Sequence, residues 1–372
     1  MNFDYNEEQQ LLADSVRRYL AKDYDFEKRR KLVASDEGWS AQVWAQLAEL
    51  GVTGIPFPAD YGGFGGGAVD LMGVMEAFGD ALLVEPYLPT VGLAGQLVAR
   101  GGNEAQKKSI LPRLVEGKLR LAFAHTERGA RYNPAGVQAR AARSGTGWEI
   151  TGAKCVVLGA PMAETLVVSA RTEKGVSLFL LERNAAGVGV KPYRTLDGMR
   201  AADVELKAVK AGPEALLGKD GEALALIEDV TDFATALVCA ESVGAMKFAC
   251  DTTLEYLKTR KQFGVPIGTF QALQHRMVDM FISYEQAKSM ACLACSKADT
   301  ASDARERARS ISAAKIRIAD ACRHISQEAV QLHGGMGMSE ELKVSHTFRR
   351  LTMIAQQFGD ADHHLARFAR LG

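Results

Sequence analysis

The sequence predicts an α+β fold with an N-terminal helical domain over residues 1–118, a middle antiparallel β-barrel domain over residues 119–221 and a C-terminal four-helix bundle over residues 222–372. Two observations predict this order. Apolar residues recur at helical spacing before and after the middle segment, and the middle segment consists of short runs rich in β-forming residues. A chain of 372 residues also exceeds the size of one compact core, which favours two or three subdomains.

The N-terminal domain begins with a helix-start signal. Asn6 can act as an N-cap, and Gln9 stands at the third helical position, where it can complete a capping box. Residues 61–67 read Tyr-Gly-Gly-Phe-Gly-Gly-Gly and lack the Lys-Ser/Thr pair of a nucleotide-binding loop, which indicates a connection between helices. Further helical patterns cover residues 69–78, 91–100 and 104–114.

The pattern changes near Leu119 and changes back near Glu222. Short strand-like runs separated by Gly, Ser or Asn fall at residues 137–141, 148–152, 155–158, 165–170 and 176–181, a spacing that suggests a small antiparallel barrel or sandwich. Four long helical patterns follow at residues 222–259, 269–297, 304–332 and 340–357. Their lengths suit an up-and-down four-helix bundle.

Composition excludes several classes of protein. Lys plus Arg equals Asp plus Glu at 45 each, so net charge gives no argument for binding nucleic acid or an anionic membrane. No signal peptide and no run of 18 apolar residues is present, so we expect a cytoplasmic protein without a membrane span. We also expect no metal site: Cys292 and Cys295 lie in an apolar helical pattern, and the adjacent His363 and His364 would point to different faces of a helix.

Two motifs in the C-terminal domain indicate chemistry. The first contains Arg260, Phe263 and Gly264 and continues as Ile-Gly-Thr-Phe-Gln271; the second is Gln331-Leu-His-Gly-Gly-Met-Gly337. The planar fork of an Arg suits a pyrophosphate, and glycines let backbone N–H groups approach a phosphate closely. The alternative is a pair of helix ends with ordinary caps. His275 and His333 lie inside these motifs and are interpreted as packing residues.

With these motifs the sequence resembles the acyl-CoA dehydrogenase family over almost its whole length, including residues 50–56 and 122–127. The resemblance implies the helical, β, helical order, bound FAD and an acyl-CoA substrate. In that family a carboxylate takes the α proton of the thioester and the flavin N5 takes the β hydrogen as hydride. It further implies an electron-transfer flavoprotein or a similar acceptor.

The family builds each flavin site from two chains, so the resemblance implies a dimer or tetramer, either a homo- or a hetero-oligomer. Thr126 is implied as a contact of the flavin ring. The residues implied to contact the pyrophosphate and adenine of a neighbour's cofactor are Arg260, Phe263, Gln271, Gln331, Gly334 and Gly335.

The sequence departs from the family pattern at the ring face and at the base. Val156 stands where the family has a Trp over the flavin. The family's loop Glu is replaced by Gly359, and Asp360 follows it; Ala234 holds the family's alternative base position, and Glu241 lies two turns further along that helix.

Asp360 and Glu241 are therefore the candidate catalytic carboxylates. Asp360 is alternatively a helix N-cap, and both roles can coexist; Glu241 is alternatively a structural hydrogen-bonding group that needs a partner when buried. Three functions remain open: an acyl-CoA dehydrogenase, a supporting subunit of a hetero-oligomeric dehydrogenase that contributes cofactor contacts in trans, and a flavin oxidase on the same fold.

Overall fold

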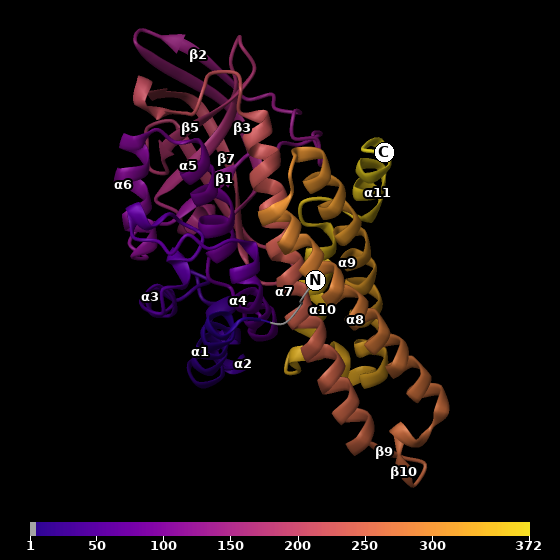
Figure 1. Ribbon diagram of the computed structural model, residues 1–372. Helices are drawn as coiled ribbons and strands as arrows, with labels where there is room; N and C mark the ends of the chain where they lie inside the picture. The colour runs from indigo at the N-terminus through magenta and orange to yellow at the C-terminus, as the bar shows by residue number, and fades with distance from the viewer. Residues whose placement is uncertain (1–4) are drawn as a thin grey trace. The chain divides into compact units, whose positions relative to one another are not determined.

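The structure is a computed structural model that describes residues 5–372. It divides into two compact units, each built from separate stretches of chain (Figure 1). The first unit contains the chain up to Arg30, Gly67–Leu83 and Thr235–Gly372, and the second contains Lys31–Gly66 and Val84–Ala234. The sequential domain limits 1–118, 119–221 and 222–372 stay a prediction.

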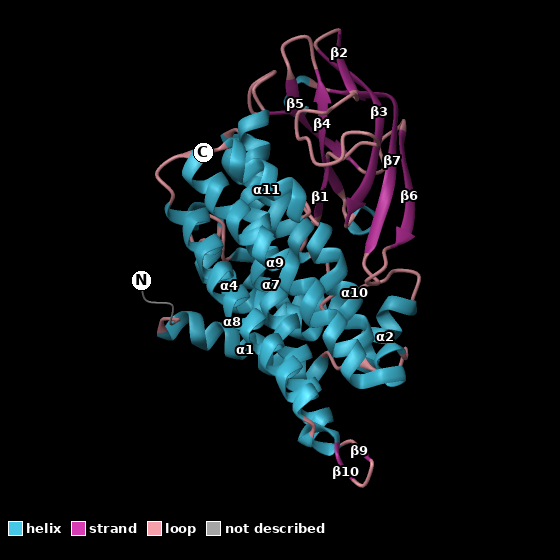
Figure 2. Ribbon diagram, turned by 90° about the vertical axis from the view of Figure 1, so that its right-hand side faces the viewer, coloured by secondary structure: helices cyan, strands magenta, loops and turns pink. Residues whose placement is uncertain are grey.

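The first unit is mostly helical; Figure 2 draws the helices of the protein in cyan. The four long helical patterns of the C-terminal part are confirmed, and the largest boundary difference is three residues, for example Lys343 instead of residue 340. The helices of this unit, including two that extend into the second, are α1 (Glu7–Asp23), α2 (Phe26–Ala34), α4 (Ala68–Ala81), α7 (Leu224–Thr259), α8 (Gln271–Thr300), α9 (Ala304–His333), α10 (Lys343–Gln356) and α11 (Ala361–Arg370).

Local sequence explains where these helices begin and which face they bury. The predicted capping box of α1 is confirmed: Gln9 N donates to Asn6 Oδ1 at 2.8 Å, and Asn6 N donates to Gln9 Oε1 at 3.0 Å. In α9, Ile311, Ile318 and Ile325 recur every seven residues and are all fully buried. This spacing places them on one face of the helix, which packs against the neighbouring helices.

Helices α4 and α7 touch backbone to backbone. A Cβ added to Gly79 would lie 1.8 Å from the backbone oxygen of Glu241, and one added to Gly244 would lie 1.8 Å from that of Glu76. Any side chain at either glycine would force the helices apart. This close crossing fixes the position of α7 at Glu241, one of the predicted functional residues.

The second unit is organised around an eight-stranded sheet in the order β6-β7-β3-β2-β4-β5-β8, with β1 paired to β4. The predicted β domain is confirmed, but it is not wholly antiparallel, because β1 and β2 both pair with β4 in parallel. The strands are β1 (Leu121–Ala124), β2 (Arg140–Ser144), β3 (Gly147–Leu158), β4 (Thr165–Arg171), β5 (Val176–Glu182), β6 (Val188–Arg194), β7 (Arg200–Ala211) and β8 (Leu216–Leu217).

Three α-helices lie wholly within the second unit: α3 (Ala41–Glu49), α5 (Gly95–Gly101) and α6 (Glu104–Val115). The Gly-rich stretch at residues 61–67 connects a short helical turn, Ala59–Tyr61, to α4, as predicted. Cys292 and Cys295 are buried free thiols, which confirms their interpretation as small apolar residues.

Among residues 5–372, one helix, α7, is long and apolar enough to span a membrane by length and composition alone. Its most apolar stretch is 89% buried inside the protein. This burial is typical of a core helix of a soluble protein, because a lipid-facing helix would expose that surface.

Candidate functional site

The two cofactor-like motifs, some 70 residues apart in the chain, meet at one place in the first unit. His333, at the end of α9, stacks on Tyr256 of α7 with ring centroids 4.4 Å apart. Tyr256 lies one turn before Arg260, and His333 directly precedes Gly334. The ring of His333 is buried and its Nδ1 lies 2.8 Å from Ala329 O, so this histidine is the packing residue that the sequence indicated. Burial also lowers its pKa.

A hairpin carries the aromatic residue of the first motif. Strands β9 (Lys261–Gln262) and β10 (Val265–Pro266) pair in antiparallel fashion and project beyond the ends of α7 and α8 (Figure 1). Phe263 at the tip is 90% exposed and has a φ of +56°, in the left-handed region that bulky residues rarely adopt. Its ring lies edge-on to that of Phe270, with centroids 6.1 Å apart, so two exposed aromatic side chains lie side by side at this hairpin.

The polar residues of the motifs are exposed and available. Arg260 follows the last residue of α7, Gln271 begins α8, and Gln331 lies in the last turn of α9. Each side chain is exposed and makes no hydrogen bond or ion pair with a described residue. A guanidinium and two amides without internal partners form a donor set that suits a pyrophosphate.

The glycines of the second motif leave open space above the backbone. Gly334 is the C-cap of α9 with a φ of +60°, and its N–H donates to Gln331 O, so the capping alternative is confirmed. A Cβ built on Gly334 or on Gly335 would meet nothing within 4 Å. A ligand can therefore reach this backbone directly. The ligand role of the two glycines stays a prediction.

The short loop after α10 holds one candidate base. Phe358 and Gly359 have φ values of +60° and +124°, and the next residue, Asp360, is the N-cap of α11. One carboxylate oxygen of Asp360 accepts a hydrogen bond from His363 N at 2.8 Å, so the predicted N-cap is confirmed. Its role as a base stays a prediction.

The other candidate carboxylate has a buried partner. Arg350 of α10 donates to Glu241 of α7 through Nε at 2.6 Å and through Nη2 at 2.8 Å, and both residues are 4% exposed. The sequence predicted that a buried Glu241 needs a partner, and the structure identifies it. This geometry supports the structural alternative for Glu241. Sequence reasoning missed Arg350, although an Arg between Thr347 and Leu351 on the apolar face of α10 signals a buried ion pair.

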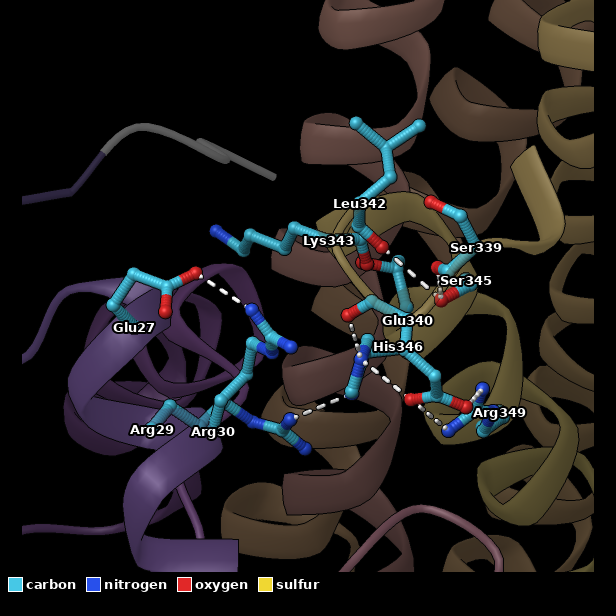
Figure 3. A network of polar contacts seen from close by, with 11 residues as sticks. Glu27, Arg29, Arg30, Ser339, Glu340, Leu342, Lys343, Ser345, His346 and Arg349 are labelled. Atoms are coloured by element: carbon cyan, nitrogen blue, oxygen red, sulfur yellow. Dashed lines mark hydrogen bonds and ion pairs between the residues drawn. The ribbon is translucent and has the colours of Figure 1, made fainter. Parts of the chain in front are cut away.

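A second polar network fixes the start of α10 (Figure 3). Arg29 Nη1 lies 3.1 Å from His346 Nδ1, and Arg29 Nε donates to Leu82 O at 2.7 Å. Since an Arg only donates, His346 Nδ1 accepts, and its Nε2–H donates to Glu340 O at 3.1 Å. Arg349 closes an ion pair on Glu340. Burial lowers the pKa of His346, which keeps the ring neutral and able to accept.

The ring-face residues lie in the second unit. Thr126 follows β1, is exposed, and accepts a hydrogen bond from Cys155 N at its backbone oxygen at 2.8 Å. Val156 is 46% exposed at a bulge in β3, with a φ of +53°. Its N–H donates to the hydroxyl of Tyr193 at 3.1 Å, and that hydroxyl donates to Asp203 at 3.2 Å. A β-branched residue in this conformation is strained, and strained bulges occur preferentially beside active sites.

A buried ion pair supports the segment around Thr126. Lys154, whose side chain is fully buried, donates to Glu127 at 2.6 Å and to Ser169 Oγ at 3.0 Å. Glu127 also accepts from the backbone N–H groups of Gln138 and Ala139. Burial by itself would raise the pKa of Glu127, but the hydrogen bond from Lys154 holds it below its usual value. Sequence reasoning did not identify this pair; a Lys inside a run of strand residues is the signal that it missed.

Comparisons with known proteins agree with this arrangement. Family models described as the N-terminal, middle and C-terminal domains of acyl-CoA dehydrogenase match residues 6–118, 122–209 and 224–370. The chain is 32% identical over 370 residues to acyl-CoA dehydrogenase FadE12 of Mycobacterium tuberculosis, covering 95% of this chain and 93% of that protein.

Two solved structures are also similar over the full length. The ChsE4–ChsE5 complex from Mycobacterium tuberculosis matches with a TM-score of 0.90 and 25% identity, covering 100% of this chain and 98% of the other. The structure of PigA with FAD and proline matches with a TM-score of 0.91 and 26% identity, with the same coverage of 100% and 98%.

Proposed function

This chain belongs to the acyl-CoA dehydrogenase family, and on that premise we propose that it is a FAD-dependent oxidoreductase that removes hydrogens from the α and β carbons of an acyl-CoA thioester. The single observation that carries the proposal is the stack of Tyr256 on His333, which brings the two cofactor-like motifs to one place. Neither motif alone is specific, but their convergence is what a shared ligand requires.

The residues of the first unit fit the phosphates of FAD. Arg260 and Gln331 offer exposed donors without internal partners, and the backbone at Gly334 and Gly335 is open to a ligand. Since all these groups face outward, they suit the cofactor of a neighbouring chain. We therefore propose a dimer or tetramer. Bound FAD supplies the hydride acceptor, and Thr126 is the proposed contact of its ring.

Asp360 is the proposed base. It follows Gly359, which stands where the family places its loop Glu. A carboxylate has about four acceptor sites, so one oxygen can cap α11 while the group accepts an α proton. When a bound acyl-CoA excludes water, desolvation raises the pKa of a carboxylate and makes it a better base.

The test is anaerobic reduction of the purified holoenzyme by a panel of acyl-CoA thioesters of different length and polarity. We expect FAD at one per chain and bleaching by at least one thioester, with reoxidation by an electron-transfer flavoprotein or a similar acceptor. Rapid reoxidation by oxygen would instead indicate a flavin oxidase. A flavin-loaded chain that no thioester bleaches contradicts the proposal.

A second candidate is the supporting subunit of a hetero-oligomeric dehydrogenase. The observation that favours it is the bidentate pair of Glu241 with Arg350, which commits the second candidate base to a structural contact. Val156 and Gly359 also replace a flavin-covering Trp and a catalytic Glu of the family. One similar structure is that of a complex between two different proteins, ChsE4 and ChsE5. Purification of the chain alone without FAD, and its recovery of FAD with a second chain, would support this candidate.

A further inference from the structure

A buried lysine holds the turn that presents Asp360. Lys315 of α9 is fully buried, and its Nζ donates to Gly359 O at 2.8 Å and to Ala355 O at 3.2 Å. The carbonyl of Gly359 belongs to the peptide plane that joins Gly359 to Asp360. Its orientation therefore sets the direction in which the backbone enters Asp360.

A buried histidine holds the same turn from the other side. His364 of α11 places Nε2 3.2 Å from Phe358 O and Nδ1 3.3 Å from Ser312 Oγ. Since a carbonyl only accepts, Nε2 carries the proton and Nδ1 accepts from Ser312. Ser312 and Lys315 are three residues apart on one face of α9, so this helix anchors both sides of the turn. Burial lowers the pKa of His364 to about 2, which keeps the ring neutral.

The hydrogen bonds of Lys315 differ from an ordinary C-cap of α10, because the ammonium that makes them is buried. Lysines that cap helix C-termini usually keep the ammonium in water, whereas burying an ammonium costs several kcal/mol before compensation. Burial lowers the pKa of Lys315, and the charge of Asp360 opposes that change. The groups that face Lys315 electrostatically are Cys239 of α7, Cys322 of α9, and Asp360, His363 and His364 at α11.

Asp360 is the one carboxylate among these described groups. Burial raises the pKa of Cys239 and of Cys322 to about 12, so both thiols are neutral. Burial also lowers the pKa of His363 and of His364, so both rings are neutral. The charged groups of this cluster are therefore the buried ammonium and Asp360, together with Arg367 and Arg370 of α11, which act on the two histidines.

We propose that Lys315 is a positioning residue for the reaction: it fixes the Gly359–Asp360 peptide and thereby the direction from which the carboxylate of Asp360 meets the α proton. The inference rests on the proposed function, because it assigns Asp360 as the base. It adds a residue that does not touch the substrate but acts through Asp360.

The experiment compares Lys315→Met, Lys315→Gln and Asp360→Asn in the holoenzyme. Lys315→Gln removes the charge but keeps a hydrogen-bond donor, so it still tests the proposal if the methionine variant does not fold. The matched control is Lys343→Met, which removes a largely buried lysine at the opposite end of α10, where it pairs with Asp80. FAD content, thermal unfolding, and the kcat and KM of flavin reduction by acyl-CoA are measured for each variant.

We expect both Lys315 variants to retain FAD and to reduce flavin about tenfold more slowly at saturating acyl-CoA, because a displaced turn misplaces the carboxylate relative to the α proton. KM should be nearly unchanged, since Lys315 does not touch the substrate. Lys343→Met should keep the wild-type rate.

Each other outcome overturns the proposal in a distinguishable way. If Asp360→Asn is inactive but the Lys315 variants keep the wild-type rate, the positioning role is wrong and the proposed function stands. If Asp360→Asn reduces flavin at the wild-type rate, the base assignment fails, and any effect of Lys315 is structural. If neither Lys315 variant folds with FAD bound, Lys315 is a structural residue only.

Discussion

Arg350 of α10 donates two hydrogen bonds, 2.6 and 2.8 Å long, to the carboxylate of Glu241 of α7. The pair lies at the level where α7 meets α4 without any side chain between the backbones, since Gly79 faces the backbone oxygen of Glu241. This ion pair therefore ties α10, and with it the turn that carries Asp360, to the close crossing of α4 and α7.

Removing one member of this pair should be more damaging than removing both. Glu241→Met or Arg350→Met leaves a buried group without its charged partner, and we expect each to lower the free energy of unfolding by about 3–5 kcal/mol. The double variant Glu241→Met/Arg350→Met should recover much of that loss. Chemical denaturation of the four proteins measures it, and additive losses would show that the pair is not coupled.

Asp360→Asn should separate catalysis from capping. Asn is as good an N-cap as Asp, so stability should change by less than about 0.5 kcal/mol, while flavin reduction should slow by at least ~100-fold. The control is Asp303→Asn, which alters the N-cap of α9, where Asp303 accepts from Glu306 N. Bleaching at the wild-type rate by the Asp360 variant would leave Asp360 as a cap only.

Arg260→Ala, with Gln331→Ala as a second variant, should weaken FAD retention without unfolding the protein. A charge-assisted hydrogen bond to a pyrophosphate contributes about 1.5–3 kcal/mol, or roughly one to two powers of ten in affinity. Exposed Arg323 of α9, whose contact is a loose pair with Asp320, provides the control as Arg323→Ala. Equal FAD affinity in the wild type and in the variant that combines Arg260→Ala with Gln331→Ala would contradict the proposed cofactor contacts.

Val156→Gly should stabilise the protein. The φ of +53° strains a β-branched residue by about 1–3 kcal/mol, which exceeds the extra chain entropy of a glycine, about 0.5–1 kcal/mol. Thermal unfolding should therefore show a higher Tm. The neighbouring Val157 is buried, so Val157→Gly should lower the Tm. A lower Tm for Val156→Gly would mean that the valine side chain contributes more than its strain costs.

Acid should destabilise the second unit through His125. Burial is the main cause that lowers the pKa of His125 to about 4, below its usual value of 6.5. Between pH 6.5 and about 4, the unfolded chain therefore binds a proton at His125 that the folded protein does not bind. Stability should fall as the pH drops from about 6.5 to about 4, by up to ~1.4 kcal/mol per pH unit. Denaturation at pH 7, 5.5 and 4.5 measures this loss, and His125→Gln should reduce it.

The features of this protein that could be predicted from its sequence are those that depend on residues close together in the chain. Helical periodicity predicted the four long helices to within three residues, and an Asn and a Gln three residues apart predicted the first cap. These features depend on residues that are neighbours in the chain. The motifs at Arg260 and Gln331 were also visible, because each is a contiguous string whose residue types match phosphate chemistry.

Only the tertiary structure decided which distant groups meet. The partner of Glu241 is Arg350, 109 residues away, and the support of the Asp360 turn is Lys315 on a different helix. The parallel pairing of β1 with β4 likewise joins segments that no local period relates. A sequence pattern shows that a charge will be buried and so must be paired, but the choice of partner follows from how the helices and strands pack together.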